Sequence, residues 1–511
     1  MLSARKPYNL PVNIASLLAA ASVRWGEQAA WIFAERRASY RESADRVARL
    51  ASGLGKQFDP GSRIVLVMAN GPEFFEVLWA AFWAGMVAVP VNRHLHPREL
   101  GYVISHSGAS LVIYDEHTRD TVGDSGAGVT LVDASSGGLD SLADPEPAHV
   151  AEVGPDSPAW LFYTSGTTGR PKGATLTHRN LLAMTLNYYA DIDPVDPGTV
   201  YAHAAPLSHG SGLYLLPAVG HGATNVISAS LAFDPGDFLS LIGEHGVTHA
   251  AFLAPTMLRR LTDAARQAGS PPTLGHIMVG GAALYEQDLA DAIEVFGPVV
   301  GQMYGQGESP MTIAVMPPRL LTARDAPDSN WRSCGRPFTG VEVRIGDGRD
   351  GDEAAGDGDG EIWVRGDVVM SGYWDNPEAT ASTLVDGWLA TGDIGHLDSR
   401  GFVYLTDRAK DVIISGGSNI YPREVEEALL LHPAVHEAVV VGVPDPEWGE
   451  SVRAYVVLAP GDTATEGELI THCQGLIASF KKPKSVVFAE DLPKSANGKM
   501  LKRVLRDQAA Q

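Results

Sequence analysis

Cysteine and long apolar runs are the two features that this sequence has least of. Only Cys334 and Cys473 occur in 511 residues, and they lie far apart along the chain. Two distant cysteines cannot build a disulfide framework, and they suit a reducing compartment. The longest apolar stretch, residues 77–91, is shorter than a membrane span and is interrupted by Gly85 and Pro90. The sequence therefore predicts no transmembrane segment, no secretory signal and a cytoplasmic location.

Positive charge is also scarce. The 39 Lys and Arg residues stand against 61 Asp and Glu residues, which gives a formal net charge of −22. This balance argues against nucleic acid as a partner, since duplex binding requires clustered Lys and Arg. One segment differs, because eight basic residues accompany only two acidic ones between Lys481 and Arg506. A basic patch on an acidic protein indicates a small polyanionic ligand, although a solvated surface would have the same composition.

The remaining composition is that of a globular protein, and the length predicts two or more domains. Strand-like runs at residues 63–70 and 111–115 alternate with helical patterns at 72–85 and 96–108. This alternation predicts an α/β protein with largely parallel sheets. The Gly- and Asp-rich segment 346–361 lacks the spacing of a calcium-binding loop and predicts a solvated hairpin turn.

A second, smaller domain is predicted at the C-terminal end. Between Arg408 and Asp411 a strand gives way to charged residues, a glycine-rich loop and a helix opened by Pro422. The remainder reads as strand, loop, helix, two strands, helix and strand, which is enough for an α+β domain of about a hundred residues. We therefore divide the chain into residues 1–408 and 409–511.

The stretch YTSGTTGRPKGAT, residues 163–175, predicts a phosphate-binding loop. Its glycines free backbone N–H groups, and its hydroxyls and one ammonium group add further donors for phosphate oxygens. It is not a Walker loop, because the Gly-Lys-Ser/Thr sequence is missing. The candidate ligands are Thr164, Ser165, Gly166, Thr167, Thr168, Gly169 and Lys172.

Seven further segments follow this loop in order. With the loop, they resemble the signature blocks of the adenylate-forming (AMP-binding) superfamily, of the acyl-CoA synthetase type for fatty or aryl acids. The resemblance covers essentially the whole chain. It implies an α/β fold with a large multi-sheet N-terminal adenylate-forming domain and a small mobile α+β C-terminal lid domain. The segments are PLSHGSG (206–212), GGAAL (280–284), MYGQGESP (303–310), GEIWVRG (360–366), GWLATGDIG (387–395), DRAKDVIISGGSNIYPREVE (407–426) and PKSANGKMLKR (493–503).

The resemblance also implies a reaction. A carboxylic acid would attack the α-phosphate of ATP and release pyrophosphate, and coenzyme A would then displace AMP, with Mg²⁺ assisting the first step. The acid would be an aryl or medium- to long-chain monocarboxylate, because the segments expected to line the acyl pocket are small and apolar. They offer no obvious buried Arg or Lys for a second carboxylate. A separate carrier protein or another acceptor stays open as an alternative to CoA. The protein would be a monomer or a homodimer.

The roles of the family's residues carry over to individual positions. Lys499 would bridge the carboxylate and the α-phosphate region, Glu308 would bind magnesium, and His209 would sit where the acyl group enters, so these three are the implied catalytic residues. Asp393, assisted by Arg408, would accept hydrogen bonds from the ribose hydroxyls, since a carboxylate offers two acceptors in one plane. The adenine would lie near Gly280, Gly281, Ala282, Tyr304 and Gly305.

The resemblance further implies an acyl pocket, a hinge and a CoA site. The lid would rotate about Lys410 between the two half-reactions, so that glycine backbone faces the passing pantetheine. The implied CoA contacts are Ser415, Gly416 and Gly417. The implied acyl-pocket residues are His209, Gly212, Gly281, Gly305 and Gly307.

One position departs from the family pattern. The family usually carries Thr immediately before the metal-binding Glu, whereas this chain has Gly307. Either Thr164 or Ser309 supplies the missing hydroxyl, or the missing side chain widens the acyl pocket. A protein that kept the fold and lost the chemistry is disfavoured, because the chain retains the full set of charged site residues: Lys172, Glu308, Asp393, Arg408 and Lys499.

Overall fold

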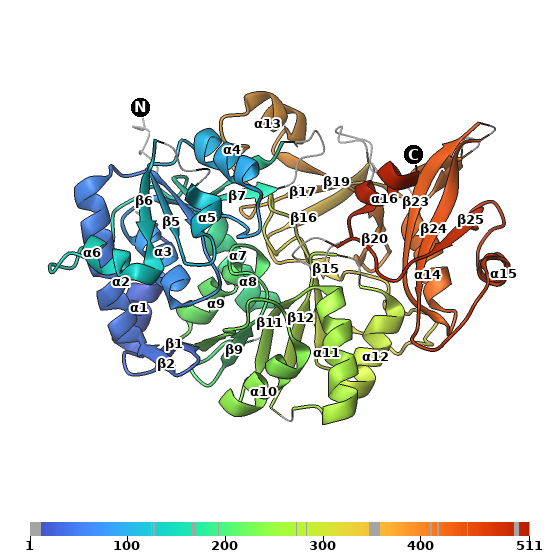
Figure 1. Cartoon of the computed structure of the whole chain (residues 1–511), viewed down its shortest axis with the longest axis horizontal. Helices are drawn as coiled ribbons and strands as arrows, with labels where there is room; N and C mark the ends of the chain where they lie inside the picture. Colours follow the sequence, from blue (N-terminus) through green and yellow to red (C-terminus); the bar gives the residue numbers. More distant parts are fainter. Residues whose placement is uncertain are drawn as a thin grey trace, which may run out of the picture.

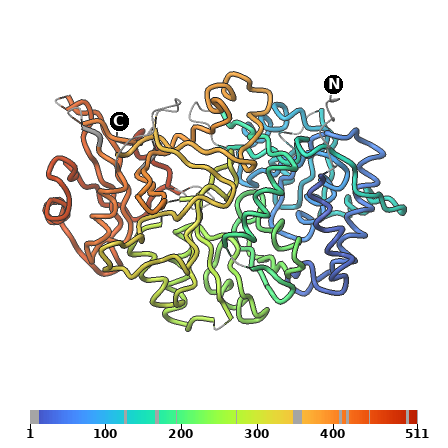
Figure 2. Tube along the Cα trace, turned by 180° about the vertical axis from the view of Figure 1, so that it is seen from behind, coloured from blue at the N-terminus to red at the C-terminus, as the bar shows by residue number. Residues whose placement is uncertain are grey.

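The computed structural model describes residues 12–123, 125, 128–164, 170–192, 194–271, 273–282, 284–346, 358–408, 411–415, 418–446, 448–494 and 500–509. These residues form four β-sheets with helices packed around them. Figure 1 shows the N-terminal part (blue) and the C-terminal part (orange to red) at opposite ends, with residues of the middle of the chain (green to yellow) between them, and the view from behind shows the same order (Figure 2). No helix among the described residues is long and apolar enough to cross a membrane.

The largest sheet has nine strands, and its centre is parallel as predicted. In spatial order the strands are β15 (Arg336–Pro337), β14 (Ala314–Met316), β13 (Val300–Tyr304), β12 (His276–Val279), β11 (His249–Leu253), β9 (Val200–His203), β10 (Thr224–Ile227), β1 (Ala29–Phe33) and β2 (Arg36–Ser39). Its helices include α10 (Pro235–His245), α11 (Pro255–Ala268) and α12 (Glu286–Phe296). The short η2 (Pro318–Leu320) follows β14.

The second sheet has six strands, of which all but the last pair are parallel. The order is β6 (Thr130–Asp133), β5 (Leu111–Tyr114), β3 (Arg63–Val67), β4 (Val87–Pro90), β7 (Pro158–Thr164) and β8 (Lys172–Thr177). The helices of this part of the chain are α1 (Ser16–Arg24), α2 (Tyr40–Gln57), α3 (Pro72–Trp83), α4 (Pro97–Ser107), α5 (Arg119–Gly123), η1 (Ala134–Ser136), α6 (Gly138–Leu142), α7 (His178–Asp191), α8 (Gly210–Leu213) and α9 (Leu215–Gly220).

Local sequence rules explain where several of these helices begin. Helix α2 starts after Ser39, which forms a capping box with Glu42, and α7 starts after Thr177, which forms one with Asn180. Helix α3 begins with Pro72, whose fixed φ suits the first helical position. Because Thr177 ends β8, its cap makes α7 start as soon as the strand stops.

The third sheet is antiparallel, which the strand and helix alternation did not predict. It contains β16 (Glu342–Gly346), β17 (Gly360–Arg365), β18 (Leu384–Val385), β19 (Trp388–Leu397) and β20 (Val403–Arg408), with α13 (Pro377–Thr383) beside it. Gly346 pairs with Glu361, so the strands on either side of the Gly- and Asp-rich segment form a hairpin. Its residues 347–357 lie outside the described part of the chain.

The fourth sheet belongs to the C-terminal segment and confirms the predicted order of elements there. It joins β22 (Ser418–Ile420), β21 (Ile413–Ser415), β24 (Gly449–Leu458), β23 (Val435–Asp445) and β25 (Ser485–Phe488), with α14 (Pro422–Leu430) and α15 (Glu466–Leu476). Strand β22 and the last helix, α16 (Lys502–Ala509), were not predicted. Among the described residues, no buried apolar cluster combines residues of this segment with residues before it. Three clusters use buried residues up to Val403, and two use buried residues from Ile413 onwards.

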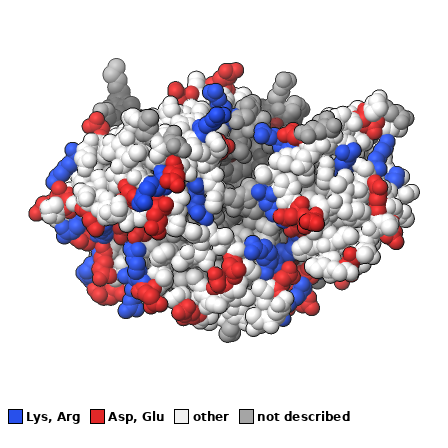
Figure 3. All heavy atoms as spheres, viewed as in Figure 1, with Lys and Arg blue, Asp and Glu red and all other residues white. Residues whose placement is uncertain are grey.

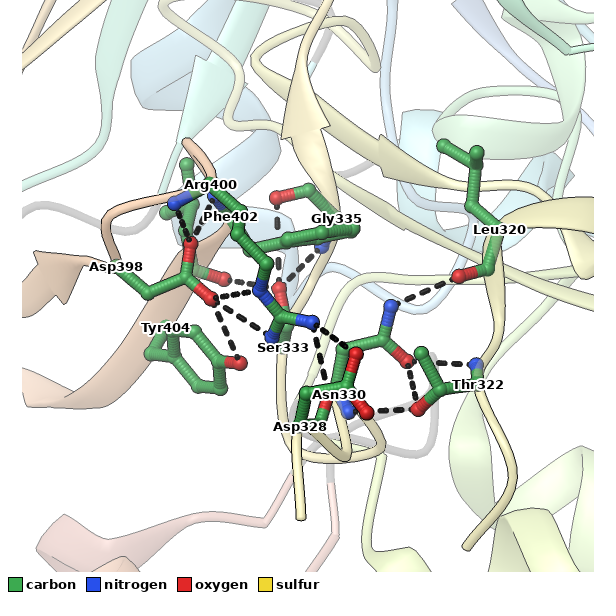
Figure 4. Close-up of polar contacts among 11 residues, drawn as sticks. Leu320, Thr322, Asp328, Asn330, Ser333, Gly335, Asp398, Arg400, Phe402 and Tyr404 are labelled. Carbon is green, nitrogen blue, oxygen red and sulfur yellow. Dashed lines mark hydrogen bonds and ion pairs between the residues drawn. The ribbon is translucent and has the colours of Figure 1, made fainter. Parts of the chain in front are cut away.

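A polar network fixes the β19–β20 hairpin to the loop after β14 (Figure 4). Arg400, in the turn of the hairpin, donates to Asp398 and to the backbone carbonyl of Asp328 at 2.8 Å. The fully buried Asn330 donates to the carbonyl of Leu320 at 2.8 Å and accepts from the backbone N–H and the hydroxyl of Thr322. These contacts hold in place the two strands that carry Asp393 and Arg408.

The network predicts unequal costs for two neighbouring substitutions. Asn330→Ala leaves the partly buried Thr322 N–H and Leu320 carbonyl without this partner, so the free energy of unfolding should fall by about 2 kcal/mol. Asp328→Ala, the control in the same loop, removes an exposed ion pair and should cost less than about 1 kcal/mol. Urea denaturation followed by circular dichroism measures both, and equal costs would contradict the network's role.

Candidate functional site

A cavity of about 1350 Å³ lies where the C-terminal segment meets the rest of the protein. Figure 3 shows a hollow between the larger and the smaller body of the molecule. The carboxyl ends of the parallel strands β9, β11, β12 and β13 open into the cavity, which is the edge at which α/β proteins bind ligands. The wall residues that follow or end these strands are His209, Phe252, Gly280 and Gly305.

The predicted phosphate loop connects the hairpin strands β7 and β8, whose last paired residues lie at one side of this cavity. Strands β7 and β8 are antiparallel, and Thr164 and Lys172 are their last paired residues. Both line the cavity. The loop residues 165–169, which include the predicted ligands Ser165, Gly166, Thr167, Thr168 and Gly169, lie outside the described residues.

Glu308 lies opposite this hairpin and is held by two hydroxyl groups. Its Oε1 accepts a hydrogen bond from Thr164 Oγ1 at 3.2 Å and another from the Tyr373 hydroxyl at 2.8 Å. The ammonium nitrogen of Lys172 lies 4.3 Å from the centre of the Tyr373 ring. The phosphate hairpin and Glu308 therefore meet at Tyr373, which the sequence analysis did not identify.

These groups fit a magnesium ion that is shared with a nucleotide. Magnesium is usually held by one or two carboxylates together with substrate phosphates and water, rather than by a cage of protein ligands. The described residues contain no cluster of three or more His, Cys, Asp or Glu side chains that could hold a metal alone. One oriented carboxylate beside the predicted phosphate-binding hairpin is the donor set that such an ion requires.

Asp393 lies in a buried polar cluster next to the cavity. Its Oδ2 accepts hydrogen bonds from the Tyr304 hydroxyl at 2.7 Å and from Gln306 Nε2 at 2.5 Å. Burial and the neighbouring Asp393 raise the pKa of Tyr304, so the phenol remains a donor. In the β19–β20 ladder Asp393 pairs directly with Arg408, whose side chain lies outside the description. The predicted ribose pair thus comes from adjacent positions on two strands.

The predicted adenine site is partly formed by the cavity wall. Gly280, Gly281, Ala282 and Gly305 line the cavity. Tyr304 is only 7% exposed, and its hydroxyl is engaged with Asp393. A stacking role for its ring stays a prediction. Gln306, which donates to Asp393, was missed although it lies within the YGQGE segment.

The apolar part of the cavity surrounds His209 and two phenylalanines. The rings of His209 and Phe162 meet edge to face, with centres 5.8 Å apart, and His209 Nδ1 lies 2.9 Å from Ser208 Oγ. Burial lowers the pKa of His209 to about 4, so the imidazole is neutral at pH 7. Phe252 lies against three glycine backbones, because a Cβ built on Gly210, Gly280 or Gly281 would be 3.0–3.2 Å from its ring.

Three of the five predicted acyl-pocket residues are crowded by protein atoms, and at Gly305 an added Cβ would be 2.6 Å from the backbone nitrogen of Met311. Gly212 lies behind the wall, where an added Cβ would be 1.8 Å from the carbonyl oxygen of Leu207. At Gly307 an added Cβ would be 2.4 Å from Thr164 Cγ2 and 2.8 Å from the Phe162 ring. The room left by the missing side chain is therefore taken up by Thr164 and Phe162.

Thr164 and Ser309 are the two candidates to supply the missing hydroxyl. Thr164 contacts Glu308, whereas Ser309 Oγ is buried and has no hydrogen-bond partner among the described residues.

The C-terminal segment contributes the remaining wall. Lys494 and Leu501, which flank the undescribed residues 495–499, both line the cavity. Lys494 forms an ion pair with Glu437 at 2.8 Å, and Arg259 of α11 donates to the carbonyl of His436 at 3.0 Å.

The predicted catalytic Lys499 and the predicted hinge Lys410 lie outside the described residues, as do Gly416 and Gly417 of the predicted CoA site. Ser415 ends β21 and pairs with Gly449.

Comparison with known proteins identifies two family models in this chain. The AMP-binding enzyme family matches residues 18–374, and the AMP-binding enzyme C-terminal domain matches residues 424–499. A feruloyl-CoA synthase from an Amycolatopsis species is 39% identical over 92% of this chain and 93% of its own. A fatty acid–[acyl-carrier-protein] ligase from Streptomyces coeruleorubidus is 34% identical over 92% of this chain and 90% of its own.

Solved structures extend the similarity to the fold. The crystal structure of ATP-bound MatB from Rhodopseudomonas palustris is 31% identical, has a TM-score of 0.87 and covers 97% of this chain and 99% of its own. The resemblance inferred from the motif order is thereby confirmed, and so is the fold of a large N-terminal and a smaller C-terminal domain. The chain belongs to the AMP-binding enzyme family.

Proposed function

We propose that this protein is an ATP-dependent acid:CoA ligase that activates a monocarboxylic acid as its adenylate and transfers the acyl group to coenzyme A. The observation that carries the proposal is the convergence on one cavity of Glu308, the Thr164–Lys172 hairpin and an apolar pocket around His209 and Phe252. Its named relatives, a feruloyl-CoA synthase among them, support the same reaction class.

In the first half-reaction, a carboxylate oxygen of the substrate bonds to the α-phosphorus of ATP, and pyrophosphate leaves as its bond to that phosphorus breaks. Lys172 and the phosphate loop hold the departing pyrophosphate, and Asp393 with Arg408 holds the ribose. Glu308 would hold Mg²⁺, which would neutralise the charge that builds up on the phosphates. Lys499 brings positive charge to the attacking carboxylate, and neutral His209 borders the acyl group without adding charge.

In the second half-reaction, the sulfur of CoA bonds to the acyl carbon, AMP leaves and the thiol releases its proton. We infer a rotation of residues 409–511 against residues 1–408 between the two steps, about Lys410. The separate apolar cores on either side of this boundary support two rigid bodies. Polar contacts join the two bodies, such as the hydrogen bond that the Tyr285 hydroxyl donates to Glu426 at 2.8 Å. When the bodies move apart, hydrogen bonds to water can replace these contacts. The rotated lid would present Ser415, Gly416 and Gly417 to the pantetheine.

The lining of the cavity favours a monocarboxylate. Among the described lining residues, Arg259 is paired with Asp288 at 2.8 Å, and Lys494 is paired with Glu437. Two other lining arginines donate to backbone carbonyls, Arg93 to Leu231 and Arg260 to Phe233. These carbonyls leave the charge of Arg93 and Arg260 in place. The preference for a monocarboxylate therefore rests on the apolar lining around His209, Phe162 and Phe252, where an unpaired carboxylate would be costly to bury. Aryl acids suit the flat faces of Phe162 and Phe252, and medium- or long-chain acids are the other class.

An exposed surface of the C-terminal segment favours CoA over a carrier protein as the acceptor. Trp448 is 43% exposed, and the ammonium nitrogen of Lys484 lies 4.9 Å from the centre of its ring. The next residue, Gly449, pairs with Ser415 of the proposed CoA site. An exposed indole beside a cation suits a purine nucleotide, which the CoA tail has and a carrier-bound pantetheine lacks. The carrier alternative rests on the similarity to the carrier-protein ligase.

The substrates and the thiols of this protein suit the cytoplasm. ATP and CoA are supplied in the cytoplasm, which also keeps thiols such as the free, buried Cys334 and Cys473 reduced. We place the enzyme there, as a monomer or homodimer whose complete site lies within one chain.

The proposed function predicts CoA-dependent product formation that requires Glu308. Incubation with ATP, Mg²⁺, CoA and ferulate or a fatty acid such as decanoate should yield AMP and the acyl-CoA, both measured by liquid chromatography and mass spectrometry. Glu308→Gln should lower the rate about 100-fold, because it removes the charged metal ligand. A wild-type protein that forms AMP only when a purified carrier protein replaces CoA would favour the alternative acceptor.

The crowding at Gly307 predicts a loss of adenylation when the family's usual residue is restored. In Gly307→Thr the new side chain must displace Thr164 from Glu308, so acid-dependent ATP–pyrophosphate exchange should fall about tenfold for every acid. Gly55→Thr is the control, because no atom lies within 4 Å of a Cβ added there. An unchanged rate with a narrower range of acids would instead support the view that Gly307 enlarges the acyl pocket.

The Trp448 surface predicts a selective defect with CoA. Trp448→Ala should raise KM for CoA about tenfold, because stacking of a base on an aromatic ring is lost. KM for pantetheine, which has no nucleotide, should not change. Leu431→Ala, which removes another exposed apolar side chain of the same segment, should change neither value. Equal rises in KM for CoA and pantetheine in the Trp448 variant would contradict nucleotide binding there.

A further inference from the structure

The segment from Met370 to Trp374 connects two parts of the site that come from different sheets. The N–H of Met370 donates to the backbone carbonyl of Glu308 at 2.8 Å. Further along, the N–H of Trp374 donates to the carbonyl of Gly173 at 2.8 Å, and Tyr373 pairs with Ala174 in an antiparallel bridge. One short stretch of backbone is thus fastened at one end to Glu308 and at the other to the strand that begins with Lys172.

The Tyr373 side chain repeats this connection inside the cavity. Its hydroxyl donates to Glu308 Oε1 at 2.8 Å, and its ring faces the ammonium group of Lys172 at 4.3 Å. Burial and the neighbouring Glu308 raise the pKa of Tyr373, so the phenol keeps its proton at neutral pH. Tyr373 is 8% exposed; its ring belongs to the buried apolar cluster of the N-terminal part, and the residue also lines the cavity.

Packing alone does not account for these contacts. A phenylalanine would fill the same volume, but it would leave Glu308 Oε1 with Thr164 as its one described hydroxyl donor, at the longer distance of 3.2 Å. Hydrogen bonds to a charged group are stronger than those between neutral groups, and a fixed carboxylate binds a metal without first being oriented. The hydroxyl and the ring therefore serve two different charged groups.

We propose that Tyr373 is the positioning residue of the metal and pyrophosphate half of the site. Its hydroxyl orients Glu308 towards the ion, and its ring holds Lys172 at the cavity wall for the pyrophosphate. The proposal rests on the proposed function, because it assumes that this cavity binds a metal–nucleotide complex. It assigns Tyr373 no part in binding the nucleoside, which belongs to the Asp393 cluster.

Binding measurements test this role without relying on catalysis. The probes are Mn²⁺, followed by electron paramagnetic resonance in the presence of α,β-methylene-ATP, and AMP alone, followed by calorimetry. Tyr373→Phe should raise the dissociation constant for Mn²⁺ about tenfold and leave that for AMP unchanged, because only a hydrogen bond to a charged group is lost. Tyr373→Leu should in addition raise the dissociation constant for inorganic pyrophosphate about fivefold, because the ring under Lys172 is removed.

Tyr189→Phe is the matched control. Its hydroxyl is also partly buried and donates to a carbonyl at 2.8 Å, that of Pro217, at a position that does not line the cavity. It should cost similar stability and leave Mn²⁺ binding unchanged. A folded Tyr373→Phe protein that binds Mn²⁺ within twofold of the wild type would overturn the positioning role alone. A wild-type protein that binds neither the analogue nor AMP would contradict the proposed function itself.

Discussion

The hydrogen bonds between the Glu308 carboxylate and two hydroxyl groups are the contacts on which the organisation of the site depends. The carboxylate follows β13 of the nine-stranded sheet, Thr164 ends β7 of the six-stranded sheet, and Tyr373 lies in the segment between β17 and α13. Three parts of the chain that fold on separate sheets therefore meet at one oxygen atom. A shift of any of them by an ångström would change where the carboxylate lies, and catalysis that relies on positioning is sensitive to such shifts.

The charge distribution explains how a strongly acidic protein can hold a triphosphate. The net charge of −22 disfavours anions at long range, but screening limits that repulsion to about 8 Å at physiological ionic strength. Within the cavity, the Lys172 ammonium group lies over the Tyr373 ring, while Arg259 and Lys494 are paired with carboxylates.

Sequence patterns predicted the large features of this protein because those features depend on local rules. The alternation of strands and helices, the phosphate loop and the ordered motifs gave the α/β class, the C-terminal α+β unit and the family. The strand register places Asp393 opposite Arg408, and their role at the ribose stays a prediction. The antiparallel third sheet was missed although β19 has ten residues and β17 has six, because the pattern within a strand does not show in which direction its neighbours run.

The residues that the sequence did not predict act through contacts between distant segments. Tyr373 lies 65 positions from Glu308, and Phe252 is one apolar residue in a strand, where it reads as core. The same limit applies to Gly307, because only the packing of Thr164 and Phe162 around it indicates why a side chain is missing. The assignments of Lys499, Lys410, Gly416 and Gly417 rest on the family resemblance.

The central claim is that the substrate carboxylate attacks the α-phosphorus of ATP, and isotope transfer tests it most directly. A monocarboxylic acid that the enzyme accepts, labelled with ¹⁸O in its carboxylate, is incubated with the enzyme, ATP, Mg²⁺ and CoA, and the nucleotide product is examined by mass spectrometry. The account predicts AMP that carries one ¹⁸O atom and pyrophosphate that carries none. Recovery of the label in inorganic phosphate together with ADP would place the attack at the γ-phosphorus and contradict the account.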